Sequence, residues 1–417
     1  MTYYPVSFIV KIMTEQTFFG LGIAPNLLNI LDKMKFTVPT PIQHKGIPIA
    51  VEGKDLVGIA QTGTGKTLVF AVPMIQRLSF IKGKGLILVP TRELALQVDE
   101  TFQKFRQIIG AGTAVLIGGA SMENQIRTLR RDPRILIATP GRLIDHLQRR
   151  TVRLDDVRIL VLDEADRMLD MGFAPQIAKV LEGVPSDRQT MLFSATMPQE
   201  IMRLASSYMK LPVSVEIAKS GTPVEKVVQE IFIVRNEDKK LLLEKILYQY
   251  HGSVLLFTRT KYGASKIVRA VKDLGHSAAE IHSNRSFSQR REALDGFKSG
   301  KYRVLVATDI AARGIDVKGI EIVLNYDLPE DPENYVHRIG RTARAGLEGR
   351  AISFAMPDQG GDVKNIERLM KKVLPVSKHP DVPEADFYGG YTTKPHPTGF
   401  AYRGMRRASG RRPGRRR

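Results

Sequence analysis

Short apolar runs rich in Val, Ile and Leu recur along the chain, and amphipathic stretches separate them. Short runs of this kind are typical of buried strands, whereas apolar residues at helical spacing are typical of helices. The predicted strands form two series. The first series covers residues 55–60, 86–89, 135–139, 158–163 and 189–194. The second series covers residues 253–257, 303–308, 321–325 and 350–354.

Strands that alternate with helices predict an α/β fold in which each parallel sheet is sandwiched by helices. Because there are two series, we expect two tandem domains, at residues 18–218 and 229–375. We assign residues 219–228 to a linker, since Lys-Ser-Gly-Thr-Pro at 219–223 breaks regular structure. A cleft between the two lobes is then the expected ligand site.

Both ends of the chain depart from this pattern. We interpret residues 1–17 as a disordered leader, with Met13 as the alternative translation start. Residues 376–417 are rich in Gly, Pro, Tyr and Arg, which predicts a disordered basic tail. Arginines and interspersed aromatics can pair with phosphates and stack on bases, whereas a passive solubilising tail is the alternative. The tail aromatics are Phe387, Tyr388, Tyr391, Phe400 and Tyr402.

The formal net charge of +20 favours a polyanionic partner such as nucleic acid. Residues 379–417 hold nine basic residues against three acidic ones, so +14 remains on the rest of the chain. The absence of cysteine excludes disulfides and Cys-ligated zinc, and it fits a cytoplasmic location. We expect no membrane span, because no apolar run is long enough.

A glycine-rich segment at residues 60–67 reads Ala-Gln-Thr-Gly-Thr-Gly-Lys-Thr, between a predicted strand and a predicted helix. Gly63 and Gly65 let backbone amides approach a polyphosphate, and the new helix adds its positive N-terminal dipole. Lys66 can reach the β- and γ-phosphates, and the Thr67 hydroxyl can ligate Mg²⁺. Ala60 replaces the first glycine of the general pattern. The segment predicts an ATP site that also includes Thr62 and Thr64.

An acidic segment, Val-Leu-Asp-Glu-Ala-Asp at 161–166, ends a strongly apolar run. Asp163 falls at the carboxyl end of a predicted strand, where ligands bind in α/β folds. Its carboxylate can hold Mg²⁺, and Glu164 can orient or deprotonate an attacking water. Taken alone, such a segment is also typical of a helix cap. Together with the glycine-rich segment, it favours catalysis of ATP hydrolysis.

The Asp163-Glu-Ala-Asp166 segment resembles the motif that names the DEAD-box ATP-dependent RNA helicases, and further motifs of that family follow in order over residues 18–375. The resemblance implies two RecA-like domains and an RNA-stimulated ATPase that separates strands locally. The compact core and short basic tail resemble the bacterial RhlE-like subgroup.

This resemblance also implies roles for single residues. Phe18, Phe36 and Gln43 would bind adenine, and Asp316 the ribose. Arg341 and Arg344 would act as arginine fingers on the phosphates. The residues expected to couple hydrolysis to RNA are Asp166, Ser194, Thr196 and His337. The expected RNA contacts are Pro90, Arg92, Gly119, Thr139, Gly141, Arg142, Arg259, Arg290, Thr308 and Arg313. Phe287 stands where the family has a glutamine.

The resemblance further implies that ATP and RNA each bridge the lobes, so that the binding of one favours the other. We expect a monomeric core that remodels duplex RNA and RNA–protein complexes in ribosome assembly or RNA decay. Two alternatives stay open: a DNA helicase or translocase, and a passive RNA chaperone that acts through its arginine tail.

Overall fold

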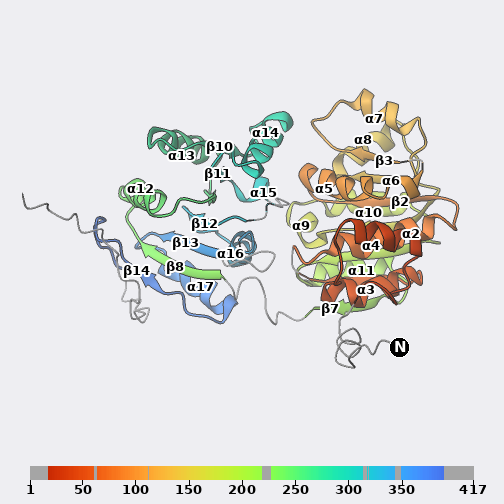
Figure 1. Ribbon diagram of the computed structural model, residues 1–417, viewed down its shortest axis with the longest axis horizontal. Coiled ribbons are helices and arrows are strands. Elements are labelled where there is room, and N and C mark those ends of the chain that lie inside the picture. Colours follow the sequence, from red (N-terminus) through yellow and green to blue (C-terminus); the bar gives the residue numbers. More distant parts are fainter. Residues whose placement is uncertain are drawn as a thin grey trace, which may run out of the picture.

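The computed structural model describes residues 17–60, 63–110, 112–217, 227–312, 317, 319–342 and 349–388. These residues form the two expected α/β lobes, which lie next to each other in Figure 1. Each lobe contains one seven-stranded sheet whose strand pairs are all parallel. In the described part of the chain, no helix has the length and apolar character needed to span a membrane.

Lobe 1 has the strand order β3-β4-β2-β5-β6-β1-β7. Its strands are β1 (Leu56–Ile59), β2 (Lys84–Leu88), β3 (Thr113–Leu116), β4 (Ile135–Ala138), β5 (Val157–Leu162), β6 (Gln189–Ser194) and β7 (Val213–Glu216). Its helices are α2 (Pro25–Lys33), α3 (Pro41–Val51), α4 (Lys66–Leu78), α5 (Arg92–Gln103), α6 (Arg106–Ile109), α7 (Met122–Leu129), α8 (Pro140–Gln148), α9 (Ala165–Asp170), α10 (Ala174–Gly183) and α11 (Gln199–Tyr208).

Lobe 2 has the strand order β10-β11-β9-β12-β13-β8-β14. Its strands are β8 (Val227–Ile233), β9 (Val254–Phe257), β10 (Ala278–Ile281), β11 (Val304–Ala307), β12 (Ile322–Asn325), β13 (Gly349–Ala355) and β14 (Val376–Ser377). Its helices are α12 (Lys239–Gln249), α13 (Lys261–Asp273), α14 (Phe287–Lys298), α15 (Asp309–Ala312), α16 (Pro332–Ile339) and α17 (Gly360–Met370). Numbered from its own first strand, lobe 2 repeats the strand order of lobe 1.

The central strands are apolar at nearly every position because both faces of each sheet are covered. In β2, Leu86 and Leu88 enter one core cluster of lobe 1, and Ile87 enters the other. Helices α3, α4 and α5 contribute to one cluster, and α8, α10 and α11 to the other. In lobe 2, Val254 and Leu255 likewise face opposite clusters.

Strand register determines which loops meet. Ile59 at the end of β1 pairs with Ser194 at the end of β6, and Leu88 pairs with Leu162 at the end of β5. The carboxyl ends of these parallel strands therefore share one edge of the sheet. The glycine-rich segment, Asp163 and Ala195 follow β1, β5 and β6 respectively, so all three lie at this edge.

The structure changes two expected boundaries. Strand β8 begins at Val227, inside the expected linker 219–228. Residues 376–388 belong to lobe 2 instead of the tail, because β14 pairs with β8 and the Tyr388 amide donates to the Pro357 carbonyl at 2.8 Å. Phe387 is only 6 % exposed in a core cluster, so it cannot stack on bases as expected. Residues 1–16 and 389–417, with Tyr391, Phe400 and Tyr402, lie outside the described residues.

Candidate active site between the lobes

The glycine-rich segment connects β1 to α4. Gly63 and Gly65 both have φ of +85°, a left-handed conformation that favours glycine. Lys66 begins α4 and is buried, and its Nζ donates a hydrogen bond to the Ala60 carbonyl at 2.8 Å. Thr67, in the first turn, is half-buried. The ammonium and the helix N-terminus form a cradle that suits a polyphosphate. Thr62 lies outside the described residues.

Helix α3 supports this loop from the side. The Gln43 side chain is buried, and its Nε2 donates to the Gly65 carbonyl at 3.0 Å. Its Oε1 accepts from the Thr40 amide at 2.9 Å, and the Thr40 hydroxyl donates to the Thr64 carbonyl at 2.8 Å. An amide side chain has two donor and two acceptor positions, so one of each is left for the edge of a base. The sequence did not predict this supporting role or the part of Thr40.

The structure does not expose Phe18 as expected for stacking on adenine. Phe18 is 4 % exposed within the core of lobe 1, whereas its neighbour Phe19 is 83 % exposed. A ring buried to this degree offers almost no free face in this arrangement. Phe36, by contrast, keeps part of its ring exposed.

Asp163 is a buried carboxylate directly after β5. Burial raises its pKa to about 6, although nearby Lys66 acts in the opposite direction. Its Oδ1 accepts a hydrogen bond from the Glu164 amide at 3.0 Å. Ionising a carboxylate in the apolar interior is costly, but a bound divalent cation stabilises the ionised form. The carboxylate and the Thr67 hydroxyl are both hard oxygen ligands, so these residues fit Mg²⁺.

Glu164 has a φ of +54°, an uncommon conformation for a residue other than glycine. Its Oε2 accepts a hydrogen bond from Arg167 Nη1 at 2.6 Å. Burial raises the pKa of Glu164, but the charges of Arg167, Lys66 and Arg341 outweigh burial, so the pKa is lowered overall. Glu164 is therefore ionised at neutral pH, as a residue that orients or deprotonates water must be.

Asp166 links α9 to the segment after β6. Its Oδ2 accepts hydrogen bonds from the Ala195 and Thr196 amides at 2.9 and 3.0 Å, and from the Thr196 hydroxyl at 3.2 Å. The Ser194 hydroxyl is buried without a hydrogen-bond partner among the described residues. The structure thus joins Asp166 directly to Thr196, while Ser194 lies beside them.

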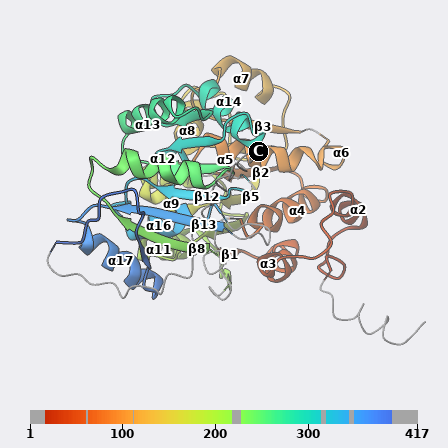
Figure 2. The ribbon, with the colours of Figure 1, turned by 60° about the vertical axis from the view of Figure 1, so that its left-hand side comes forward.

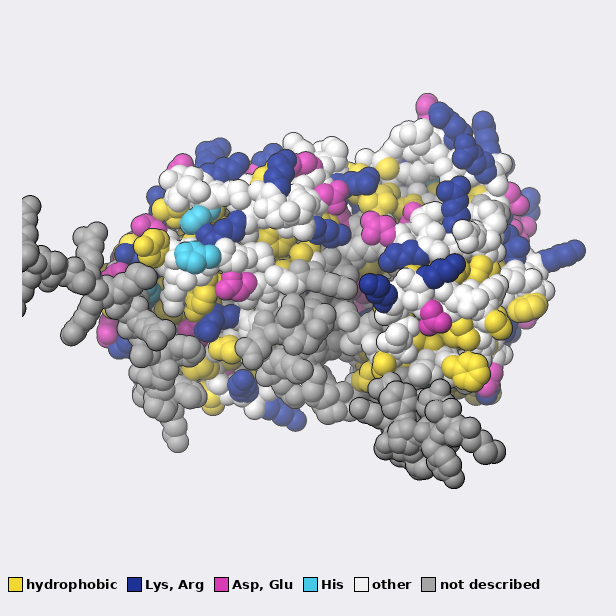
Figure 3. Space-filling model, in the orientation of Figure 1, with side chains coloured by type: hydrophobic (Ala, Val, Ile, Leu, Met, Phe, Trp, Pro, Cys, Tyr) yellow, Lys and Arg dark blue, Asp and Glu magenta, His cyan; other side chains and the backbone are white. Residues whose placement is uncertain are grey.

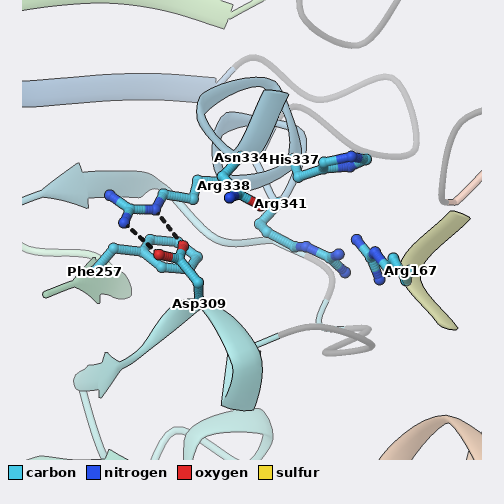
Figure 4. Close-up of a pocket in the computed structure, with 7 residues that line it drawn as sticks. All are labelled: Arg167, Phe257, Asp309, Asn334, His337, Arg338 and Arg341. Carbon is cyan, nitrogen blue, oxygen red and sulfur yellow. Dashed lines mark hydrogen bonds and ion pairs between the residues drawn. The ribbon is translucent and has the colours of Figure 1, made fainter. Parts of the chain in front are cut away.

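Lobe 2 faces these carboxylates through a pocket that also contains Arg167 of lobe 1 (Figure 4). The side chain of Arg341 is buried and points toward Arg167. Arg341 also acts electrostatically on Glu164. His337 lies on the same side of the pocket, and burial lowers its pKa to about 4, with a further contribution from Arg167. His337 is therefore neutral at pH 7. Arg344 lies outside the described residues.

Arg338, three residues before Arg341, is held entirely within lobe 2. Its guanidinium donates to both carboxylate oxygens of Asp309, at 2.5 and 2.7 Å, and to the Asn325 side chain at 3.1 Å. It also lies 5.0 Å from the centre of the Phe257 ring. These contacts fix α16 so that Arg341 faces lobe 1. The sequence alone did not indicate these roles of Arg338 and Asp309, although Asp309 directly follows the predicted strand 303–308.

Several predicted RNA contacts of lobe 1 meet around Gly119. Gly119 has φ of +75°, and a Cβ built there would lie 2.1 Å from Arg92 Nη1. On the other side, Arg142 Nη1 donates to the Ala120 carbonyl at 3.1 Å. The loop therefore lies between two arginines. Thr139 precedes α8 and Gly141 lies in its first turn, whereas Pro90 is buried before α5.

The predicted RNA contacts of lobe 2 are more dispersed. Arg290 meets lobe 1, because its Nη1 lies 3.2 Å from Glu93 Oε1. Arg259 is paired with Glu330 at 3.8 Å, and Thr308 follows β11. Arg313 and Asp316 lie outside the described residues. Lys and Arg side chains are spread over both lobes in Figure 3, and they gather over α7.

A phosphate-binding loop, paired acidic residues after a buried strand and an arginine from a second lobe define a two-lobed nucleoside triphosphatase. Family models agree. "DEAD/DEAH box helicase" matches residues 40–204, and "Helicase conserved C-terminal domain" matches residues 238–346. The chain belongs to the DEAD-box family of ATP-dependent RNA helicases.

Named relatives cover most of the chain. An ATP-dependent RNA helicase CshA of Listeria monocytogenes is 43 % identical over 89 % of this chain and 72 % of its own length. An ATP-dependent rRNA helicase RRP3 of Debaryomyces hansenii is 42 % identical over 88 % of this chain and 77 % of its own. Among solved structures, S. cerevisiae Dbp5 bound to RNA and ADP BeF3 aligns with a TM-score of 0.78 at 30 % identity, covering 87 % of this chain and 95 % of that chain.

Proposed function

We propose that the protein binds ATP with Mg²⁺ and uses its hydrolysis to separate or remodel duplex RNA and RNA–protein complexes locally. The observation that supports this most directly is the position of Arg341. It reaches from lobe 2 to the side of Arg167 and acts on Glu164 of lobe 1. An arginine brought across a cleft to a nucleotide makes hydrolysis depend on how the lobes are arranged.

Each residue at the cleft has a chemical task in this proposal. Lys66 and the N-terminus of α4 hold the phosphates, and Asp163 with Thr67 holds Mg²⁺. Mg²⁺ would neutralise charge on the phosphates when bound. Glu164 orients the attacking water and accepts its proton, and Arg341 stabilises charge that develops on the transferred phosphoryl group, together with Arg344.

RNA would bind along the arginines and backbone amides around Gly119 in lobe 1 and along Arg259, Arg290, Thr308 and Arg313 in lobe 2. Such groups suit phosphates and sugars and carry little sequence information, while contacts to 2′-hydroxyls allow a preference for RNA over DNA. The neighbour Dbp5 carries RNA in its solved structure. Asp166 and Thr196, which are hydrogen-bonded to each other, would transmit the state of the nucleotide toward this surface.

For the physiological role we propose ribosome assembly or RNA decay, in the cytoplasm and with a monomeric core. The RRP3 relatives, named as rRNA helicases, support the ribosomal branch. Membership of the RhlE-like subgroup stays a prediction, as do the adenine contacts of Gln43 and Phe36 and the ribose contact of Asp316.

Replacing Glu164 tests the central claim. Glu164→Gln keeps the shape but removes the base, so we expect ATP and RNA binding to persist while RNA-stimulated phosphate release falls about 100-fold or more. Glu182→Gln, an exposed position on α10, serves as the matched control. Phosphate release near the parent rate in Glu164→Gln would contradict the assigned role. Equal stimulation by RNA and by DNA of the same length would favour a DNA translocase instead.

A further inference from the structure

Phe287, the first residue of α14, packs across the cleft. Its half-buried side chain contacts the core cluster of lobe 1 that includes Leu94 and Ile117. Among the described residues of that cluster, it alone comes from lobe 2. The described core clusters of lobe 2 do not include it. Its apolar contact is thus made with the opposite lobe.

An ion pair lies beside this apolar contact. Arg290 is three residues after Phe287, so both side chains project from the same face of α14. The Arg290 Nη1 lies 3.2 Å from Glu93 Oε1 in the first turn of α5, and these two side chains are only 12 % and 8 % exposed. Helix α14 lies beside α5 in Figures 1 and 2.

The start of α14 holds Phe287 in a defined direction. The Ser286 hydroxyl accepts a hydrogen bond from the Gln289 amide at 3.3 Å, and Gln289 Oε1 accepts one from the Ser286 amide at 3.0 Å. This reciprocal cap fixes the first turn, where Phe287 lies. The aromatic ring is therefore presented to lobe 1 by a rigid element.

We infer that Phe287 is a positioning residue that stabilises the closed arrangement of the lobes by burying apolar surface against lobe 1. A glutamine at this position, as the family pattern has, would have to give up hydration of its amide on closure. Phenylalanine instead gains free energy when its ring leaves water. Because closure brings Arg341 to Glu164, Phe287 acts on hydrolysis through Arg341. This inference rests on the proposed function, in which RNA and ATP both favour closure.

The chain allows a direct measurement of closure because it contains no native cysteine. Phe80→Cys in lobe 1 and Tyr248→Cys in lobe 2 introduce one labelling position each, at side chains that are 82 % and 80 % exposed. Energy transfer between two dyes then reports the distance between the lobes. RNA is titrated at a fixed concentration of a non-hydrolysable ATP analogue, and the RNA concentration for half-maximal closure is compared between variants.

We expect Phe287→Ala and Phe287→Gln to raise this RNA concentration about fivefold to tenfold, the size expected for losing a half-buried aromatic contact. Phe287→Leu should recover most of the loss. Tyr262→Ala, at a 75 % exposed aromatic of α13, is the matched control and should close like the parent. RNA binding without nucleotide and the midpoint of thermal unfolding should not change, because Phe287 acts only when the lobes meet.

The possible outcomes distinguish a failure of this inference from a failure of the proposed function. If the labelled parent does not close with RNA and the analogue, the proposed function fails. If the parent closes and Phe287→Ala closes at the same RNA concentration, the inference is wrong. Equal weakening of RNA binding with and without the analogue would show that Phe287 contacts RNA instead, which also overturns it. Should the alanine variant unfold, the difference between Phe287→Leu and Phe287→Gln decides.

Discussion

The two lobes share one strand order, but the pKa values of the acidic residues at equivalent strand ends shift in opposite directions. Asp163 follows β5, and Asp327 follows the equivalent strand β12. Burial raises the pKa of Asp163 to about 6. Burial would also raise the pKa of Asp327, but Lys239 and the hydrogen bonds from the Arg259 amide and Thr258 lower it overall. In the proposed function, Asp163 of lobe 1 takes a ligand, whereas the corresponding carboxylate of lobe 2 is bound by Lys239 and Thr258 of its own lobe.

The buried lysines of the two lobes show the same contrast. Among the described residues, Lys66 Nζ donates a hydrogen bond to the Ala60 carbonyl. Lys239 Nζ donates to the Tyr326 carbonyl at 2.9 Å and to Asp327 at 2.8 Å, and it lies 5.1 Å from the centre of the Tyr326 ring. The first ammonium can be shared with a phosphate, and the second is committed to the fold.

Replacing these lysines should give the largest difference. We expect Lys66→Ala to abolish ATP-dependent unwinding, because the phosphates lose the ammonium that holds them. Lys239→Ala should instead lower the free energy of unfolding by about 3 kcal/mol, because the partly buried Asp327 carboxylate loses its cation. Strand-displacement assays and denaturant titration measure the two effects. Unwinding at the parent rate in Lys66→Ala would contradict the comparison.

The arginines Arg338 and Arg341 extend the comparison within lobe 2. Arg341→Ala should lower the RNA-stimulated kcat about 100-fold, because charge on the transferred phosphoryl loses its partner from the second lobe. Arg338→Ala should lower the free energy of unfolding by about 3 kcal/mol, since the Asp309 carboxylate loses a bidentate partner. Arg338→Lys should not restore stability, because an ammonium cannot reproduce both hydrogen bonds. Full ATPase activity in Arg341→Ala would show that this arginine does not reach the nucleotide.

Most of the central strands could be predicted from the sequence because both of their faces are buried and nearly every position is apolar. Strand β8, which lies inside the sheet of lobe 2 but contains Gln229 and Glu230, could not. The edge strands could not. Strand β10 has partly exposed positions, and β7 exposes Val213, so neither is a continuous apolar run. Strand β14 has only two residues within a Pro-rich segment. Such strands are defined by the neighbour with which they pair, and this pairing also buries the end of the segment at Phe387.

The same distinction holds at the active site. The phosphate loop and Asp163-Glu-Ala-Asp166 are continuous segments, so their chemistry follows from residue type and spacing. The contacts of Arg338 with Asp309 and of Thr40 with Thr64 join residues that are far apart in the sequence. Only the folded sheets bring them together. The burial of Phe18 also depends on the packing of the whole lobe, which its position before α2 did not indicate.

The smallest expected effect concerns stability and has opposite signs in the two lobes. The folded pKa of Asp163, about 6, exceeds its ordinary value of 3.8, so its favourable contribution is present in acid and is lost as the pH rises through 6. Without ligands, Asp163→Asn should therefore stabilise the protein at pH 7.5 by about 1–3 kcal/mol, and this gain should shrink as the pH falls toward 4.

The pKa of Asp327 is lowered instead, so its contribution is present above its ordinary pKa and is lost as the pH falls through its lowered pKa. Asp327→Asn should thus destabilise the protein at pH 7.5. Denaturant titration at several pH values measures both, and the same sign for the two variants would show that the equivalent strand ends do not differ in this way.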